Sequence, residues 1–545
     1  MLDADVGASP DRRDRVSAGL LAWPLTAALG ALCLWELLTW APNYLTWPLW
    51  ADHDVFATAA TSWDRGVLPY RDFAGNNFPG TIYLFWMFGK LFGFGWALGP
   101  SMYGFDAALV AIFGASLIFW SILRFGRAMP GLVGYGGFLG YYLTLDYSLA
   151  AQRDWQGPVF VVLGILLAQA TRGGRIGRTL AALLSAAGLI IRPQAILLLP
   201  AQAMAVAAEA RRREKSAALA LLEWSVIVAA GVALGFLPLI LSGLLGDFRD
   251  SLKVVAYGGK YNLVTAPMFL WQMVRQFQPL KIDIVPLGIA LLATRAASRT
   301  RATTGPWIVA FLGVLLYRPM SPNPLHAYLT HPLMLVWSVL AAILVEMILD
   351  REEFTASARL AMVLLVVGIG LPTAKPRFSN PNGSREAIAL LKLRREPGAK
   401  PTGYAVNPEV QSAANYEWAD YRAVLHYLRE NTSVDTKVAN CLKRVPAITG
   451  PTARLSPFPA ESIAWVVVVK ADDAELYAER LRKAEDCVVV WSPAEKGTAA
   501  SPQVAPIFAV IEEEFKPSAK FGQIEVWTRK KGVPGDFPGR QRPLE

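Results

Sequence analysis

The stretch WADHDVFATAATSWDRGVLPYRDFAGNNFPGTIYLFWMFGKLFGFG, residues 50–95, follows the first long apolar segment of the chain. It combines acidic and basic side chains with many aromatic ones, where the chain is expected to leave a membrane. Charged side chains near a bilayer cost free energy, so a cluster of them there indicates a functional site.

The composition is that of a membrane protein with a smaller water-soluble part. Of the 545 residues, 54% are hydrophobic and 18% are charged, and the mean hydropathy is +0.33. A typical soluble domain carries about 25% charged residues. Apolar runs near or above about 18 residues, the length that a helix needs to cross a bilayer, recur along the chain.

The net charge of +10 does not indicate nucleic-acid binding. The cations stand in short clusters between the apolar runs: Arg12/Arg13/Arg15, Arg124/Arg127, Arg172/Arg175/Arg178, Arg211/Arg212/Arg213/Lys215 and Arg295/Arg299/Arg301. Loops on the cytoplasmic side of membrane proteins carry such clusters. We therefore expect these loops to face the cytoplasm and expect no nucleic-acid partner.

With the basic loops inside, the apolar runs predict about eleven transmembrane helices within residues 18–372, after a cytoplasmic N-terminus at residues 1–17. The first run is too long for a signal-peptide core and predicts an uncleaved anchor. The predicted spans are residues 18–40, 101–123, 128–145, 156–170, 179–191, 194–208, 218–245, 284–293, 306–316, 327–349 and 360–371.

Residues 79–95 cannot be a further full span, because every later basic loop would then face outward. We expect an interfacial or re-entrant helix in a first external loop of about residues 41–100. Further external segments are residues 146–155, 246–283 and 317–326, together with the Arg192-Pro193 break. Polar chemistry is therefore expected on one side of the membrane.

From about residue 373 the composition changes to a linker, residues 373–401, followed by an α/β domain at residues 402–545. Predicted helices are residues 416–431, 473–484 and 507–515, and predicted strands are residues 463–470, 488–491 and 523–529. The topology places this domain outside the cytosol, where Cys441 and Cys487 could pair, although spacing alone does not show it. Without a glycine-rich phosphate loop or a triad in its sequence, we expect it to pack or to dock an acceptor.

The run Asp52-His53-Asp54 leaves three interpretations open. A carboxylate at the outer membrane surface can take a proton from a hydroxyl or amine nucleophile. Two carboxylates at i and i+2 can also bind a divalent cation such as Mg²⁺ or Mn²⁺. The third interpretation is a solvated helix start with an aspartate as N-cap.

Several residues of the first loop resemble the signature of the GT-C glycosyltransferases, closest to the protein mannosyltransferase and aminoarabinose transferase-like branch (glycosyltransferase family 39 type). The matching residues are Asp52, Phe56, Gly66, Pro69-Tyr70-Arg71-Asp72-Phe73 and Pro79-Gly80. The resemblance covers roughly residues 18–372. It implies a GT-C-like helical membrane fold and a catalytic carboxylate at Asp52, with Asp54 as the second candidate.

Two positions depart from the family pattern. The second acidic position is His53, and the lysine of the family's Lys-Pro-Pro-Gly motif, thought to grip the lipid phosphate, is Asn77. Arg71, Arg153, Arg192 or Lys260 could take over that contact. Arginine suits phosphate because its planar fork donates two charge-assisted hydrogen bonds.

The second external loop contains Gln152-Arg153-Asp154, which resembles the polar run of the family's second loop. Asp154 could join Asp52 around a metal or the acceptor, or Arg153 and Asp154 could form a plain surface pair. Arg192 could contact the lipid phosphate or only extend to the headgroups. Substrate-binding roles are also predicted for Tyr70, Asp72, Tyr261 and His331, against simple anchoring by aromatic side chains at the interface.

The resemblance implies a polyprenyl-phosphate-sugar-dependent, inverting glycosyltransferase, and the apolar runs and basic loops place it in the plasma (inner) membrane. It would transfer a sugar, with inversion, to a lipid, glycan or protein acceptor on the outer face. A transporter or flippase of lipid-linked sugars is the alternative, but charges are scarce at the centres of the long runs. A non-catalytic scaffold that presents the C-terminal domain is the third possibility.

Overall fold

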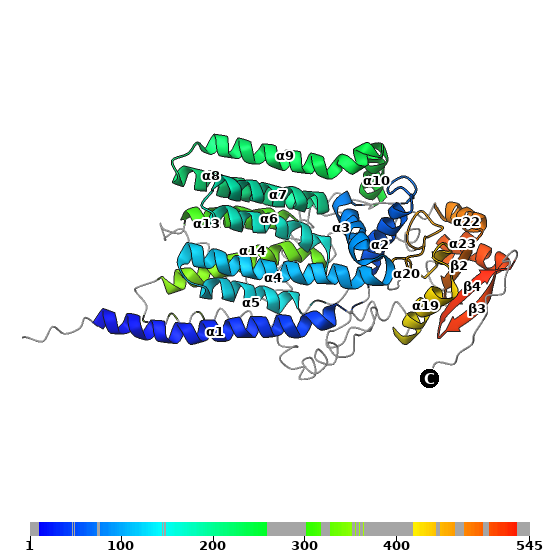
Figure 1. Cartoon of the computed structure of the whole chain (residues 1–545), viewed down its shortest axis with the longest axis horizontal. Coiled ribbons are helices and arrows are strands. Elements are labelled where there is room, and N and C mark those ends of the chain that lie inside the picture. The colour runs from blue at the N-terminus through cyan, green and yellow to red at the C-terminus, as the bar shows by residue number, and fades with distance from the viewer. Residues whose placement is uncertain are drawn as a thin grey trace, which may run out of the picture.

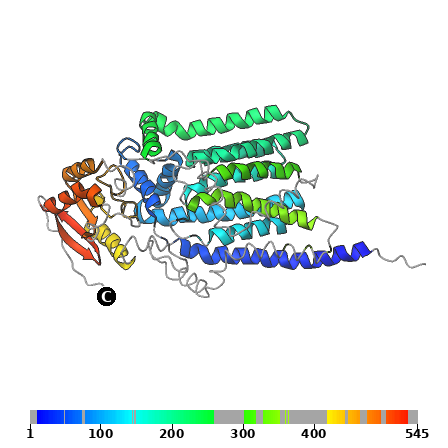
Figure 2. The ribbon, with the colours of Figure 1, turned by 180° about the vertical axis from the view of Figure 1, so that it is seen from behind.

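The computed structural model describes residues 10–45, 47, 49–73, 77–143, 145, 149–258, 301–317, 327–350, 355, 359, 363, 418–442, 447–463, 473–493 and 501–530. Nine long helices run side by side as a layered bundle, with α1 and α9 on opposite edges in both views (Figures 1 and 2). They are α1 (Pro10–Tyr44), α4 (Leu98–Phe125), α5 (Met129–Tyr142), α6 (Arg153–Ala170), α7 (Arg175–Ile191), α8 (Leu199–Arg212), α9 (Ala217–Leu241), α13 (Arg301–Tyr317) and α14 (His331–Leu349).

The bundle confirms the prediction of a polytopic helical membrane protein. Among the described residues, four helical stretches are long and apolar enough to cross a membrane: Trp23–Pro42, Gly95–Phe125, Ala217–Leu241 and Tyr328–Leu349. Thr303–Tyr317 is a shorter apolar helix. The predicted spans at residues 284–293 and 360–371 lie outside the described residues, apart from Val363.

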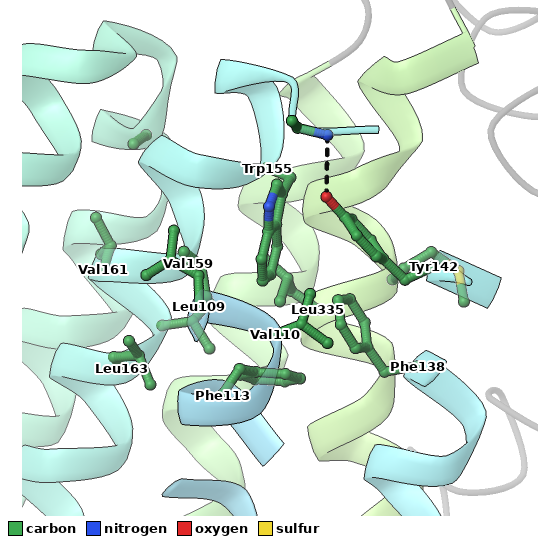
Figure 3. Packing of buried hydrophobic residues seen from close by; sticks show 14 of the residues in the cluster. Leu109, Val110, Phe113, Phe138, Tyr142, Trp155, Val159, Val161, Leu163 and Leu335 are labelled. Carbon is green, nitrogen blue, oxygen red and sulfur yellow. Dashed lines mark hydrogen bonds between the residues drawn. The ribbon is translucent and has the colours of Figure 1, made fainter. Parts of the chain in front are cut away.

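The centre of the bundle is packed with aromatic and branched side chains. Phe113 meets Phe138 edge-on at 4.9 Å between ring centroids, and Trp155 lies 5.0 Å from Tyr142 (Figure 3). The Tyr142 hydroxyl accepts a hydrogen bond of 3.1 Å from the Ala151 N–H, drawn as the dashed line. This contact fixes the turn before α6 to the end of α5.

Three of the predicted basic loops, those that contain Arg124, Arg172 and Arg213, meet at one end of the bundle. Arg124, in the last turn of α4, pairs with Glu209 of α8, and Arg213 donates to the Thr171 carbonyl at 3.0 Å. The C-terminal domain lies at the opposite end (Figure 1). We call that opposite end the domain end.

Two further helices, α2 (Ala51–Asp64) and α3 (Pro79–Phe92), lie at the domain end, with α10 (Leu245–Gly258) close by (Figure 1). Pro79 begins α3, as expected for a residue whose backbone dihedral is preset for a first turn. The 3₁₀ turn η1 (Gly95–Ala97) then leads into α4. Residues 79–95 therefore form no additional member of the bundle, in agreement with the sequence argument.

The C-terminal domain has a four-stranded sheet in the order β1-β2-β4-β3. The strands are β1 (Lys437–Asn440), β2 (Cys487–Trp491), β3 (Phe515–Phe521) and β4 (Ile524–Arg529). Only the β1–β2 pair is parallel, and the other two pairs are antiparallel. The helices are α19 (Trp418–Asn431), α20 (Thr449–Thr452), α22 (Ala474–Lys483) and α23 (Ser501–Glu514).

The domain corrects several predictions in detail. β1, β3 and α20 were not predicted, because each is short or mostly polar and lacks a clear apolar period. Phe515 begins β3 instead of ending the preceding helix. The predicted strand at residues 463–470 lies outside the described residues except for Ile463. Cys441 and Cys487 are both buried and form no disulfide bond with each other.

Candidate functional site

The helix α2 begins where the sequence places its acidic residues. Trp50 has an extended backbone at the N-cap, and Asp52 and Asp54 lie in the first turn, where carboxylates interact favourably with the helix dipole. Asp52 is half-buried, and Asp54 is only 1% exposed. The two carboxylates, two residues apart, have different surroundings.

Both oxygens of Asp54 are engaged by the C-terminal domain. Oδ1 accepts from the Gly450 N–H at 2.7 Å, and Oδ2 accepts from the Ile448 N–H at 3.0 Å and the Thr449 hydroxyl at 3.2 Å. Thr58 also donates to Oδ1, at 3.3 Å. A general base keeps an oxygen open to the acceptor, so these contacts differ from those expected of a catalytic Asp54 and leave Asp52 as the candidate.

His53 connects the first loop to the second. Its Nδ1 accepts from the Trp50 N–H at 3.4 Å, so Nε2 carries the proton and donates to the Ala151 carbonyl at 3.3 Å. Burial lowers the pKa of His53 to about 4, so the ring is neutral at physiological pH. At the family's second acidic position this chain therefore has a neutral link between two loops.

Arg192 and Asp154 form a buried ion pair. Arg192 Nη2 lies 2.7 Å from Asp154 Oδ1, which also accepts from the Tyr317 hydroxyl at 3.0 Å. Pro193 favours the extended backbone of Arg192 that ends α7. Gly157 admits Arg192 at close range, because a Cβ there would lie 2.5 Å from the Arg192 Cβ. The predicted break at Arg192 thus places its side chain inside the protein, not among headgroups.

Arg153 adjoins that pair but forms no ion pair with a described residue. Its guanidinium lies over the Phe56 ring at 5.2 Å from the centroid, an attractive arrangement for a cation. Asp52, Asp154 and Arg192 all act electrostatically on Arg153. We call Asp52, Arg153, Asp154 and Arg192 the acid–arginine cluster.

Within this cluster two buried polar atoms have no hydrogen-bond partner among the described residues, Asp154 Oδ2 and Arg153 Nε. Buried polar groups are nearly always paired in folded proteins. An open acceptor and an open donor next to Asp52 are therefore consistent with groups that await a ligand.

The predicted binding residues of the first loop lie outside this cluster and hold the loop itself. The Tyr70 hydroxyl donates to the Asn77 carbonyl at 2.7 Å, and Asp72 accepts from the Leu68 N–H at 3.1 Å. Arg71 pairs with Asp247 of α10 at 2.9 Å and is about half exposed. Arg71, considered for the phosphate contact, thus forms an ion pair that joins the segment after α2 to α10.

His331 is likewise engaged by protein groups. Its Nδ1 accepts from the Tyr141 hydroxyl at 2.7 Å, and Nε2 donates to the Leu149 carbonyl at 2.9 Å. This arrangement supports the wall behind the second loop. Lys260 and Tyr261 lie outside the described residues.

Sequence reasoning missed two carboxylates. Asp106, inside a predicted span, is fully buried and accepts from Tyr44, Tyr142, Trp155 and Gln156 at 2.5–3.1 Å. A lone acid within an apolar run was the available signal.

The second missed carboxylate, Glu461, lies in the C-terminal domain. Burial raises the pKa of Glu461 to about 8, and the nearby Asp54 and Asp52 act in the same direction. No local sequence pattern signals this residue, because the groups that surround it come from the first loop.

The predicted metal pair, Asp52 and Asp154, could contribute two oxygen ligands. Asp154 Oδ2 is an orphaned buried acceptor, which fits a ligand role. The described parts of the chain contain no group of three or more His, Cys, Asp or Glu side chains placed to hold a metal. Mg²⁺ commonly binds through one or two carboxylates and keeps several waters, so the pair fits that ion. A bound cation would supply positive charge beside a leaving phosphate.

Comparison with known proteins identifies the architecture. No family model and no curated protein sequence matches the chain. Its structure is similar to that of ArnT from Cupriavidus metallidurans bound to undecaprenyl phosphate, with a TM-score of 0.54 and 12% identity over 94% of this chain and 100% of that one.

Two further solved structures are similar at lower scores. Apo ArnT from the same organism gives a TM-score of 0.49 at 12% identity, covering 93% of this chain and 98% of that one. The archaeal oligosaccharyltransferase AglB from Archaeoglobus fulgidus, in complex with an inhibitory peptide and a dolichol-phosphate, gives 0.44 at 12% identity, covering 92% and 75%. The resemblance seen in the first loop is confirmed at the level of the fold: this chain has the GT-C fold of integral-membrane glycosyltransferases, followed by a small C-terminal α/β domain.

Proposed function

We propose that the protein transfers a sugar from a polyprenyl-phosphate carrier to an acceptor, with inversion, at the acid–arginine cluster. The observation that carries this proposal is the convergence of Asp52 from α2, Arg153 and Asp154 from α6, and Arg192 from the end of α7. The fold shared with ArnT, a protein solved with undecaprenyl phosphate, supports a lipid-phosphate donor.

Asp52 would act as the general base. It is half-buried, and no hydrogen bond or ion pair to a described residue occupies its carboxylate. In the proposed step it takes the proton from the acceptor hydroxyl or amine as that atom attacks the anomeric carbon. The bond from the anomeric carbon to the phosphate oxygen breaks on the opposite side, and the polyprenyl phosphate leaves with the electron pair.

The arginines would stabilise the departing phosphate, and their different surroundings indicate a different role for each. Arg192 is neutralised by Asp154 and held by Tyr317, so it positions the cluster. Arg153 lacks an ion-pair partner among the described residues and has an open Nε. We assign the direct phosphate contact to Arg153, in place of the missing family lysine at Asn77. Preorganised donors of this kind act where charge develops in the transition state.

The membrane orientation is part of the proposal. The clusters around Arg124, Arg178 and Arg211 belong to helix ends remote from α2 (Figure 1), and basic loops favour the cytoplasm. The acid–arginine cluster and the C-terminal domain would then face the extracytoplasmic side of the plasma membrane. Labelling of cysteines introduced at the exposed residues 213 and 485 with a membrane-impermeant reagent in intact cells tests this, and only the second should react.

The deciding experiment is a transfer assay with purified full-length protein, a panel of labelled polyprenyl-phosphate sugars, and membrane extract as acceptor. Loss of a general base typically lowers turnover by about 10²–10⁴-fold, and that loss is expected for Asp52→Asn. Asp64→Asn is the matched control, because Asp64 lies on the same helix but pairs with Lys90 at 2.5 Å. Full activity of Asp52→Asn would remove Asp52 from the reaction, and no turnover by a folded wild type would favour the transporter.

A further inference from the structure

A segment of the C-terminal domain is bound tightly by the helix that carries Asp52. We call residues 447–454, which include α20, the docking segment. Besides its three donors to Asp54, the segment donates from the Ala447 N–H to the Leu49 carbonyl at 3.1 Å. At the other end of α2, Arg65 donates to the Ala453 and Val434 carbonyls, each at 2.8 Å. Both ends of α2 are therefore hydrogen-bonded to the C-terminal domain.

The interface between α2 and the docking segment is tightly packed. A Cβ added at Gly450 would lie 2.6 Å from Asp54 Oδ1 and 2.6 Å from the Ala57 Cβ. Real Cβ atoms do not approach so closely, so the contact requires glycine. Thr58 and Thr449 also share a hydrogen bond of 2.7 Å across the same interface. Asp54 is consequently a fully enclosed acceptor for backbone groups of another domain.

Asp54 follows Asp52 by two residues on the same helical turn. A change in how Asp54 is held would therefore tilt or shift the turn that carries Asp52. We propose that Asp54 is a positioning residue that fastens the C-terminal domain to α2 and so fixes Asp52 opposite Arg153. The C-terminal domain is then an integral part of the catalytic geometry, not only a platform for the acceptor. The catalytic half of this inference rests on the proposed function, whereas the docking half does not.

The substitution Asp54→Asn tests the contact with little change in volume. Each oxygen of Asp54 accepts a backbone N–H, so one of the two would face an amide NH₂ in the variant, donor against donor. Hydrogen–deuterium exchange of the full-length protein should become at least about tenfold faster at the Ile448 and Gly450 amides. Asp64→Asn should leave both exchange rates unchanged.

A second variant changes the same interface on the docking segment instead of on α2. Gly450→Ala keeps Asp54 intact but forces the docking segment away from Ala57. If Asp54 acts through the domain, both variants should lower kcat by about tenfold or more. The donor KM should change little, because under the proposed function the lipid phosphate is bound by Arg153 of α6, which neither substitution alters. A variant that merely folds in lower yield would contain fewer active molecules, each with the wild-type kcat. Rates are therefore divided by the amount of protein that unfolds at the wild-type melting temperature.

The docking role of Asp54 and its positioning role in catalysis can be rejected independently of each other. Unchanged exchange at Ile448 and Gly450 in both variants would overturn the docking role, whether or not the enzyme turns over. If Asp54→Asn loses activity while Gly450→Ala stays fully active with a displaced segment, Asp54 acts in the chemistry itself and the positioning role is wrong. Faster exchange in both variants, together with no sugar transfer by the wild type, would reject the proposed function alone.

Discussion

Two carboxylates lie fully buried in the bundle, Asp106 and Asp154. They differ in how many of their oxygens accept hydrogen bonds. Asp106 accepts from four neutral donors shared between its two oxygens. Asp154 has one oxygen bound by Arg192 and Tyr317, while its second oxygen has no partner among the described residues. The first is a closed structural centre. Asp154 belongs to the acid–arginine cluster, and its second oxygen can still accept a hydrogen bond or ligate an ion.

This difference indicates how to separate structure from function in the same protein. A carboxylate whose oxygens are satisfied contributes to folding, and its removal leaves orphaned donors. An open oxygen at a buried position is costly unless a ligand satisfies it. By this criterion we assign a structural role to Asp106 and Asp54, and we propose that Asp52, Arg153 and Asp154 form the part of the cluster that binds a substrate.

The largest effect on stability is expected for Asp106→Ala. The variant leaves the hydroxyls of Tyr44 and Tyr142, the Trp155 ring N–H and the Gln156 amide without their acceptor. With about 1–3 kcal/mol for each orphaned donor, the loss should be about 4 kcal/mol or more. Thermal unfolding in detergent measures it. A melting temperature equal to that of the wild type would show that Asp106 is no structural centre.

The next effect distinguishes the two arginines. Arg192→Ala leaves Asp154 as an unpaired buried charge and should cost about 3 kcal/mol of stability. Arg153→Ala breaks no ion pair with a described residue, so it should melt close to wild type and yet lose most of its transfer activity. Parallel melting curves and transfer assays compare them. Equal destabilisation by both would contradict the division of roles.

A smaller, pH-dependent effect is expected at Glu461. Its pKa is raised from an ordinary value of 4.5 to about 8, so its contribution to stability is complete below pH 4.5 and is lost as the pH rises toward 8. The loss is at most about 1.4 kcal/mol per pH unit within that window. Glu461→Gln removes the ionisation. The variant should therefore lose less melting temperature than wild type between pH 5 and pH 9, and identical slopes would refute the assignment.

The smallest effect is expected for Arg71→Ala. Arg71 and Asp247 form an exposed ion pair, with side chains 47% and 34% exposed, and such pairs contribute about 0–1 kcal/mol. The variant should fold normally and transfer sugar at nearly the wild-type rate in the same assay. A loss of activity comparable to that of Arg153→Ala would place Arg71 at the phosphate after all.

Much of the fold follows from local properties of the chain. The apolar runs at residues 101–123 and 218–245 became α4 and α9 within a few residues, because a lipid-exposed backbone must satisfy its own hydrogen bonds as a helix. Pro193 marked the end of α7 and hence the position of Arg192. Short strands such as β1 were missed, since their four residues gain stability from β2 and not from their own sequence.

The sequence by itself determined that polar residues of the first loop, the second loop and the Arg192 break should share one side of a helical membrane domain, because apolar run lengths and basic loops constrain topology. The first-loop resemblance favoured Asp52 over Asp54, but the sequence could not show what surrounds either of these identical side chains. The structure shows that Asp54 is held by the Ile448 and Gly450 amides, 394 and 396 residues further along the chain. Only tertiary packing brings such distant donors to one carboxylate and leaves the other open.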